Sequence, residues 1–140
     1  MMESTFEKLS KQPLLDVLYE EDLAEILPLA HPGTFERDEV VFREGEEARN
    51  FYLITDGQFE VRREEADGEH RINLLYPGEF FGDIALLHDV PRAATVRAVD
   101  DSEVLYFTKE AFFRLLDTYP ILDRRLELLG AEIERRTLQG

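Results

Sequence analysis

Residues 78–96 read GEFFGDIALLHDVPRAATV, and this stretch carries most of what the sequence says about fold and function. The apolar run 84–87 is too short for an ordinary helix and predicts a single helical turn, whose first backbone N–H groups follow Gly82. Unpaired N–H groups at the start of a helix attract anions. The stretch therefore predicts an anion site at this turn.

Arg92 is the second chemical feature of this stretch. It follows a proline and precedes two small residues, Ala93 and Ala94, which let a ligand approach the backbone closely. The arginine fork suits phosphate, and Asp83 can accept hydrogen bonds from sugar hydroxyls. Together these residues indicate a pocket for one small sugar phosphate. Two plainer alternatives stay open: Arg92 pairs with a carboxylate, and Asp83 is a helix cap or an exposed turn acid.

Short β-rich segments alternate with turn signals on both sides of this stretch. The expected strands are residues 39–43, 51–55, 58–63, 71–76, 94–99 and 103–108. Asp56-Gly57 and Asp67-Gly68 are dipeptides typical of hairpin turns. Many short strands at regular spacing predict a closed jelly roll, or β-roll.

Helical patterns flank this β-rich zone. Pro32-Gly33 ends the first pattern, Thr108 is a candidate N-cap for the last one, and Pro120 starts its second segment. The fold class expected is mainly β with flanking α. One domain over residues 1–140 would hold N-terminal helices at 13–30, a β-roll at 33–108 and C-terminal helices at 109–138.

The charge of the chain excludes several function classes. Among 140 residues there are 31 Asp and Glu against 16 Lys and Arg, which gives a net charge of −15 at pH 7. Such a chain is repelled by nucleic-acid backbones and by anionic membranes, so we expect no direct binding to either. With no signal peptide and no apolar run of membrane-spanning length, the expected location is the cytoplasm.

The residue types needed for catalysis or metal binding are scarce. There is no cysteine, and the three histidines, His31, His70 and His88, are scattered singly. A cupin-like metal centre in a β-roll needs clustered ligands, and no serine nucleophile motif is present. We therefore expect no enzyme activity, no metal and no cofactor.

The chain resembles the cyclic nucleotide-binding domain family, which includes the catabolite activator protein and the regulatory subunits of cyclic-AMP-dependent kinase. The resemblance covers residues 13–136. Its motifs are FREGE at 42–46, FYLITDG at 51–57, PGEFFG at 77–82 and the phosphate-binding cassette FGDIALLHDVPRAATVRA at 81–98. The core of the cassette is residues 82–95. The resemblance implies a β-roll that binds a cyclic nucleotide.

The family's roles carry over to the first half of the cassette as follows. Gly82 matches the glycine whose backbone approaches the ribose. Asp83 stands where the family usually has a glutamate that bonds the ribose 2′-hydroxyl. Ile84 and Ala85 would offer backbone N–H groups at the start of the short helix.

The remaining roles belong to the phosphate and the base. Arg92 matches the arginine that pairs with the cyclic phosphate, and Ala93 and Ala94 would contribute backbone contacts to the phosphate oxygens. Val61 and Leu75 fall near positions that line the base. Members selective for cyclic GMP often carry Thr or Ser where this chain has Ala93, so the resemblance favours cyclic AMP over cyclic GMP.

Two positions depart from the family pattern. The side chain of Asp83 is one methylene shorter than glutamate, so its carboxylate falls short by about 1.5 Å. The consequence is a shifted loop, a bridging water or weaker binding. Asp38 occupies a turn where the family favours glycine, and aspartate tolerates such turns.

The C-terminal segment has two interpretations. Leu122, Leu126, Leu129 and Ile133 recur at steps of four, three and four residues. This stripe fits either a helix packed on the β-roll or a short coiled-coil seam of a homodimer.

The functional prediction is a regulatory module that couples ligand binding to movement of its C-terminal helices. The alternative is a structural or protein-interaction domain that has lost its ligand. The sequence ends too soon after the last helix for a DNA-binding motif. If it is the full protein, output is expected through an effector protein or through dimerisation; if it is a fragment, the effector was removed.

Overall fold

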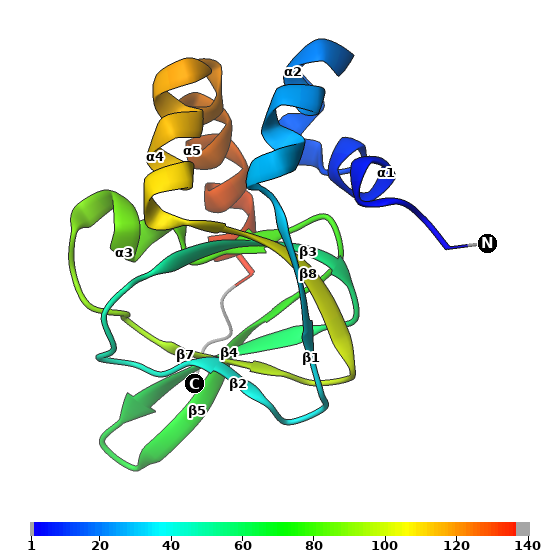
Figure 1. The fold of residues 1–140 in the computed structure, drawn as a ribbon. Coiled ribbons are helices and arrows are strands. Elements are labelled where there is room, and N and C mark those ends of the chain that lie inside the picture. Colours follow the sequence, from blue (N-terminus) through cyan, green and yellow to red (C-terminus); the bar gives the residue numbers. More distant parts are fainter. Residues whose placement is uncertain (1, 137–140) are drawn as a thin grey trace.

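The computed structural model of the chain describes residues 2–136, and in it two four-stranded antiparallel sheets form a β-roll (Figure 1). The first sheet has the order β1-β8-β3-β6 and the second the order β2-β7-β4-β5. The strands are β1 His31–Phe35, β2 Val40–Phe42, β3 Asn50–Asp56, β4 Phe59–Glu65, β5 Gly68–Leu75, β6 Phe80–Phe81, β7 Thr95–Ala98 and β8 Ser102–Thr108. The fold class expected from the sequence, mainly β with flanking helices, is confirmed.

Two strands were missed by the sequence pattern. Strand β1 begins at His31 and runs through Pro32-Gly33, where the sequence pattern predicts the break between helix and roll. Because β1 is an edge strand, a proline there need not interrupt the sheet. Strand β6 has only two residues, too few to show a periodicity.

One of the two predicted hairpin turns is a crossing between sheets instead. Asp56-Gly57 follows β3 of the first sheet and leads into β4 of the second. Gly57 has φ of +85°, and a Cβ there would lie 2.1 Å from the Ser102 hydroxyl oxygen, so only glycine fits. The second turn does form a hairpin between β4 and β5, with Ala66 and Asp67 as its two loop residues.

The N-terminal helices are shorter and start earlier than the range 13–30 predicted. They are α1 Thr5–Ser10, the 3-10 turn η1 Pro13–Leu15, α2 Glu20–Ile26 and the 3-10 turn η2 Leu27–Leu29. Helix α1 begins before residue 13 because the Ser4 hydroxyl accepts a 3.1 Å hydrogen bond from the backbone N–H of Glu7. Helix α2 starts separately after its N-cap residue Tyr19, whose backbone N–H donates to the carboxylate of Asp22. This second helix start interrupts the continuous helical pattern predicted for residues 13–30.

The C-terminal helices follow the prediction closely. They are α4 Lys109–Thr118 and α5 Ile121–Glu134, and Thr108 caps α4 by accepting from Ala111 N–H at 3.2 Å. The expected end at residue 138 lies outside the described residues. Within residues 2–136, no helix is long and apolar enough to cross a membrane.

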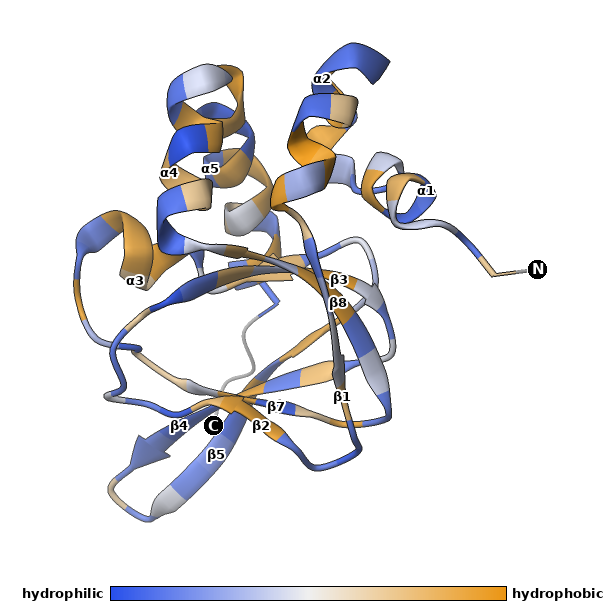
Figure 2. Ribbon diagram, in the orientation of Figure 1, coloured by the Kyte–Doolittle hydropathy of each residue, from blue (hydrophilic) through white to orange (hydrophobic). Residues whose placement is uncertain are grey.

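Two apolar clusters hold the domain together. One joins the helices to the outer side of the β1-β8-β3-β6 sheet and includes Leu15, Phe51, Phe107, Phe112 and Leu126. The other fills the interior of the roll and includes Phe42, Tyr52, Ile54, Phe59 and Phe81. In Figure 1 the helices α2, α4 and α5 lie together on one side of the roll, and Figure 2 shows apolar residues on the helices where they meet it.

The apolar stripe of α5 packs inward. Leu122 and Leu126 are 1% and 2% exposed and belong to the cluster between helices and sheet. Leu129 and Ile133 also pack against the core. The interpretation of this stripe as a coiled-coil seam is therefore wrong in this structure, and its packing on the roll is confirmed.

Candidate functional site

The short helix expected after Gly82 is present as α3 Asp83–His88. Gly82 precedes it with φ of +92°, and a Cβ there would lie 3.0 Å from the backbone oxygen of Asn50 and 3.3 Å from an amino nitrogen of Arg92. A larger residue would be strained in its backbone and crowded by both neighbours. Glycine at this position thus sets the start of α3 beside Arg92.

A cavity of about 520 Å³ lies between α3, the loop after it, strands β4 and β5, and the end of α5. All nine residues proposed from the sequence line it: Val61, Leu75, Gly82, Asp83, Ile84, Ala85, Arg92, Ala93 and Ala94. Sequence positions more than thirty residues apart therefore meet in one site. Ligand pockets of small molecules fall in the same size range.

Several further residues line the cavity and were missed by sequence reasoning. They are Phe42, Arg63, Ile72, Asn73, Phe80, Phe81, Val90, Pro91, Val96, Gly130, Ile133 and Glu134. The β4–β5 register pairs Asn73 with Val61, so strand alternation gave a signal for Asn73. The three residues of α5 had no such signal, because their place depends on how the helix docks on the roll.

Arg92 is held by the backbone. Its side chain is 5% exposed, and its two amino groups donate to the carbonyl oxygens of Gly82 at 2.8 Å and Asn50 at 2.7 Å. Its guanidinium carbon lies 3.9 Å from the centre of the Phe42 ring, a cation–π arrangement. Neither hydrogen-bond acceptor is a carboxylate, so Arg92 is not fixed by the carboxylate pairing that the sequence left open.

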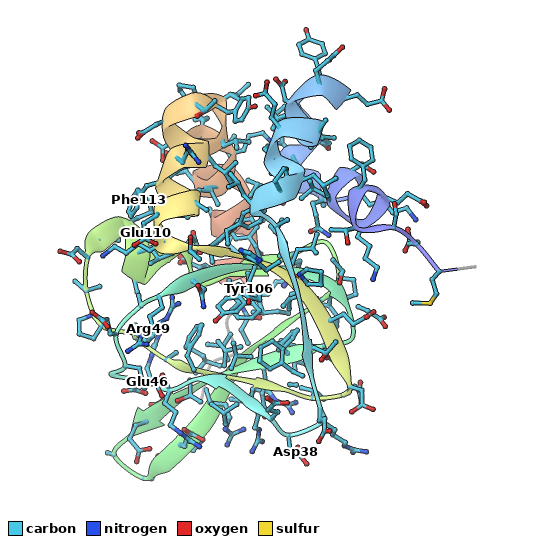
Figure 3. The ribbon with its side chains drawn as sticks, in the orientation of Figure 1. Asp38, Glu46, Arg49, Tyr106, Glu110 and Phe113 are labelled. Carbon is cyan, nitrogen blue, oxygen red and sulfur yellow. The ribbon has the colours of Figure 1, made fainter. Side chains whose placement is uncertain are left out.

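The main chain of Arg92 is also anchored. Its N–H donates to the oxygen of Glu46, and its oxygen accepts from the N–H of Gly45, both at 2.8 Å. Figure 3 places Glu46 on the segment after β2, on the same side of the molecule as α3, whereas Asp38 lies at the far turn. Asp38 has φ of +71°, which agrees with a turn that favours glycine.

One hydrogen-bond donor of the Arg92 guanidinium has no acceptor among the described residues. Its Nε is buried and makes no hydrogen bond with any residue the structure describes. Burial lowers the pKa of Arg92, but arginine stays protonated in proteins. A buried cation without a carboxylate partner is costly unless an anion joins it. This arrangement is suited to binding an anion in the cavity.

Asp83 is the first residue of α3 and is 7% exposed, so it is not an exposed turn acid. Burial, with a smaller contribution from the negative charge of Glu134, raises the pKa of its carboxyl to about 6. The backbone N–H groups of Asp83 and Ile84 and the charge of Arg92 act in the opposite direction. The cavity therefore contains a carboxyl that changes charge close to neutral pH.

The end of α5 forms one wall of the cavity. Asn73 donates a 2.9 Å hydrogen bond from its amide to the oxygen of Ile133. Just beyond the helix, Arg136 donates to Glu79 at 2.7 Å and to the oxygen of Leu74 at 3.2 Å. These contacts join the C-terminal helix to strand β5 and to the turn that follows it.

The side chains that line this cavity include no cluster of metal ligands. Within residues 2–136, no three His, Cys, Asp or Glu side chains lie close enough together to hold a metal ion. His88, the histidine nearest to the cavity in sequence, is exposed at the end of α3. The chemistry that the residues can perform is recognition of an anion and a polar group by Arg92 and Asp83, beside an apolar wall.

Comparison with solved structures finds the same fold. The catabolite activator protein of Thermus thermophilus superimposes with a TM-score of 0.78 and 29% identity, covering 89% of this chain and 59% of that chain. The regulatory domain of Toxoplasma gondii PKA with cAMP gives a TM-score of 0.70 and 25% identity, covering 79% of this chain and 42% of that chain.

Sequence comparison agrees with these structures. The cAMP-dependent protein kinase regulatory subunit of Hypocrea atroviridis is 34% identical over 139 residues, covering 94% of this chain and 29% of that protein. This chain spans about a third of the length of such curated relatives. A family model described as the cyclic nucleotide-binding domain matches residues 32–119. The chain therefore belongs to the cyclic nucleotide-binding domain family.

Proposed function

We propose that the cavity binds a cyclic nucleotide, with cyclic AMP preferred to cyclic GMP. The observation that carries this proposal is Arg92: a buried guanidinium held by two carbonyls, with its Nε unpartnered, in the wall of a cavity of about 520 Å³. Its preferred partner is an anion of phosphate geometry. The proposed role is binding and not catalysis.

The parts of the ligand match the parts of the cavity. The cyclic phosphate faces Arg92 and the backbone of Ala93 and Ala94 in this proposal. The ribose lies against Gly82 and Asp83 and the start of α3, where Ile84 and Ala85 offer N–H groups. The base packs against an apolar wall that includes Val61 and Leu75. Ala93 offers no hydroxyl to a guanine amino group, which supports cyclic AMP.

The proposed output is a change in the packing of the C-terminal helices. Gly130, Ile133 and Glu134 of α5 line the same cavity as Arg92, so a ligand in the cavity contacts this helix. A contact that differs between the bound and unbound protein shifts the position of α5. An effector protein, or a second copy of the chain, would bind differently to the shifted helix. The expected location of the protein is the cytoplasm.

The competing proposal is a domain of the same fold that has lost its ligand. The feature that favours it is Asp83, whose carboxyl is buried and shorter than the glutamate usual in the family. A lost hydrogen bond to a charged acceptor weakens binding by about 10- to 150-fold. This difference in affinity is large but measurable.

A thermal-shift panel tests the proposed function. Cyclic AMP, cyclic GMP and the open-chain control 5′-AMP are added at millimolar concentration. A ligand at 100 times its dissociation constant adds about 2.7 kcal/mol, which raises the melting temperature by roughly 5–10 °C in a domain of this size. We expect cyclic AMP to give the largest shift. No shift with either cyclic nucleotide would favour the domain that has lost its ligand.

A further inference from the structure

The charged residues of the cavity are arranged in an unexpected way for a site that takes an anion. Four charged side chains line it: Arg63 and Arg92 are cationic, and Asp83 and Glu134 are anionic. With both carboxyls ionised, the cavity has no net positive charge to attract a cyclic phosphate. Asp83 has a proposed ligand role in the first half of the cassette, but Glu134 comes from the C-terminal helix and has none.

We propose that Glu134 is an affinity-limiting residue of this site, whose carboxylate disfavours an anionic ligand and sets a ceiling on its affinity. This inference rests on the proposed binding of a cyclic nucleotide. It adds that the ligand's negative charge is opposed by a residue of α5, the helix proposed to respond to that ligand.

The residues that flank Glu134 in the sequence are hydrogen-bonded to the β-roll. The preceding residue, Ile133, accepts a hydrogen bond from Asn73, and Arg136, two residues later, is bonded to Glu79 and Leu74. These contacts come from β5 and the following turn, which are parts of the roll. Glu134 thus belongs to a helix end that is docked on the roll.

Glu134 is a solvent-exposed residue that lines the cavity. Its negative charge raises the pKa of Asp83, as expected for two carboxyls that line the same cavity. Arg92 acts on Asp83 in the opposite sense. The nearby cation Arg136 is already engaged by Glu79, so it does not serve as a counter-ion dedicated to Glu134. An incoming phosphate therefore meets an opposing charge as well as the Arg92 guanidinium.

The test compares Glu134→Gln with Glu132→Gln by calorimetric titration with cyclic AMP at pH 7.5. Glu132 is an exposed residue of the same helix that does not line the cavity, so it controls for the loss of one negative charge. We expect Glu134→Gln to tighten binding by about 3- to 10-fold over the wild type and Glu132→Gln to change it by less than twofold. The gain should shrink in 0.5 M NaCl, because salt screens charges.

A second readout needs no ligand. Carbon NMR of the Asp83 carboxyl should show a lower pKa in Glu134→Gln than in the wild type and the control. Equal or weaker binding by Glu134→Gln, an equal gain in Glu132→Gln, or an unchanged pKa of Asp83 would each overturn the inference. If none of the three proteins binds a cyclic nucleotide, the proposed function itself fails and this inference falls with it, whereas equal binding by all three defeats only the role of Glu134.

Discussion

The guanidinium of Arg92 donates a 2.8 Å hydrogen bond to the carbonyl oxygen of Gly82, the residue immediately before α3. The two residues are ten positions apart in the sequence. The hydrogen bond directly connects Arg92, the proposed phosphate contact, to Gly82, a proposed ribose contact. Asn50 of β3 accepts the second bond of Arg92, at 2.7 Å, so the pair is also tied to the first sheet. Arg92 thus supports the shape of the cassette as well as its proposed charge recognition.

The first prediction concerns Gly82. Gly82→Ala should lower the free energy of unfolding by about 2–4 kcal/mol, because it adds backbone strain at positive φ and crowds the Asn50 oxygen at 3.0 Å. Gly45→Ala is the matched control: its φ is +89°, but a Cβ there meets nothing within 4 Å. Urea denaturation should show a larger loss for Gly82→Ala. An equal decrease in the free energy of unfolding for the two variants would mean that crowding at Gly82 does not contribute to the destabilisation.

Glu60 gives a prediction on stability away from the cavity. This carboxylate of β4 is 1% exposed and accepts from Arg62, Arg71 and Arg97 at 3.0, 2.9 and 2.6 Å. Burial alone would raise the pKa of Glu60, but the hydrogen bonds from the three arginines outweigh it and hold the pKa below its ordinary value. The stability that Glu60 contributes is therefore present above the pKa of the unfolded chain and lost as pH falls through the lowered pKa.

Glu60→Gln should accordingly lower the free energy of unfolding by about 2 kcal/mol at pH 7, with a smaller loss as pH drops below 4. Glu64→Gln, an exposed position of the same strand, should change it by less than about 0.5 kcal/mol. Guanidinium denaturation at a series of pH values measures both. A loss for Glu60→Gln that does not diminish in acid would contradict the ionic account.

Asp83 predicts the opposite pH dependence. Its folded pKa of about 6 lies above the unfolded value near 3.9, so its contribution to stability is fully present below pH 3.9 and is lost as pH rises through 6. Asp83→Asn removes the ionising group. It should be more stable than the wild type by up to about 3 kcal/mol at pH 8, and by much less at pH 4.

Thermal denaturation at pH 4, 6 and 8 checks this prediction for Asp83. Asp117→Asn, an exposed position of α4, controls for the loss of one negative charge. A stabilisation by Asp83→Asn that is the same at all three pH values would show that burial of the carboxylate is not its source.

Asp83 also predicts a change in affinity. If the short side chain weakens the proposed bond to the ribose hydroxyl, Asp83→Glu should tighten cyclic AMP binding by about 5- to 30-fold, the value of one charge-assisted hydrogen bond. Competition against a fluorescent cyclic nucleotide measures the change. Weaker binding by Asp83→Glu would mean that the loop has adapted to aspartate and that the longer side chain crowds the ligand.

The sequence predicted the parts of this molecule that depend on local chemistry. The turn after Gly82, the Thr108 cap and the cassette around Arg92 are each encoded within a few residues, and all appear where expected. The crossing at Asp56-Gly57 was misread because a turn dipeptide does not say to which sheet the next strand belongs. Strand β1 was missed because an edge strand tolerates Pro32.

The rest of the site depends on long-range packing. Glu134 and Ile133 reach the cavity only because Leu122 and Leu126 dock α5 on the roll. The apolar steps of that helix fit a coiled coil equally well, and no local signal separates the two. The structural role of Arg92 was hidden for a similar reason, because its acceptor on Asn50 lies 42 residues away.

The central claim is that Arg92 holds a cyclic phosphate in this cavity. Calorimetric titration of the wild type and Arg92→Lys with cyclic AMP tests it most directly, because lysine keeps the positive charge and loses the arginine fork. Urea denaturation first confirms that the variant is folded, since Arg92 also bonds to the backbone carbonyls of Gly82 and Asn50.

We expect one saturable site in the wild type with micromolar affinity, weakened at least 30-fold in Arg92→Lys, which corresponds to about 2 kcal/mol. Equal affinity in a folded Arg92→Lys, or no binding by the wild type at millimolar cyclic AMP and cyclic GMP, would contradict it.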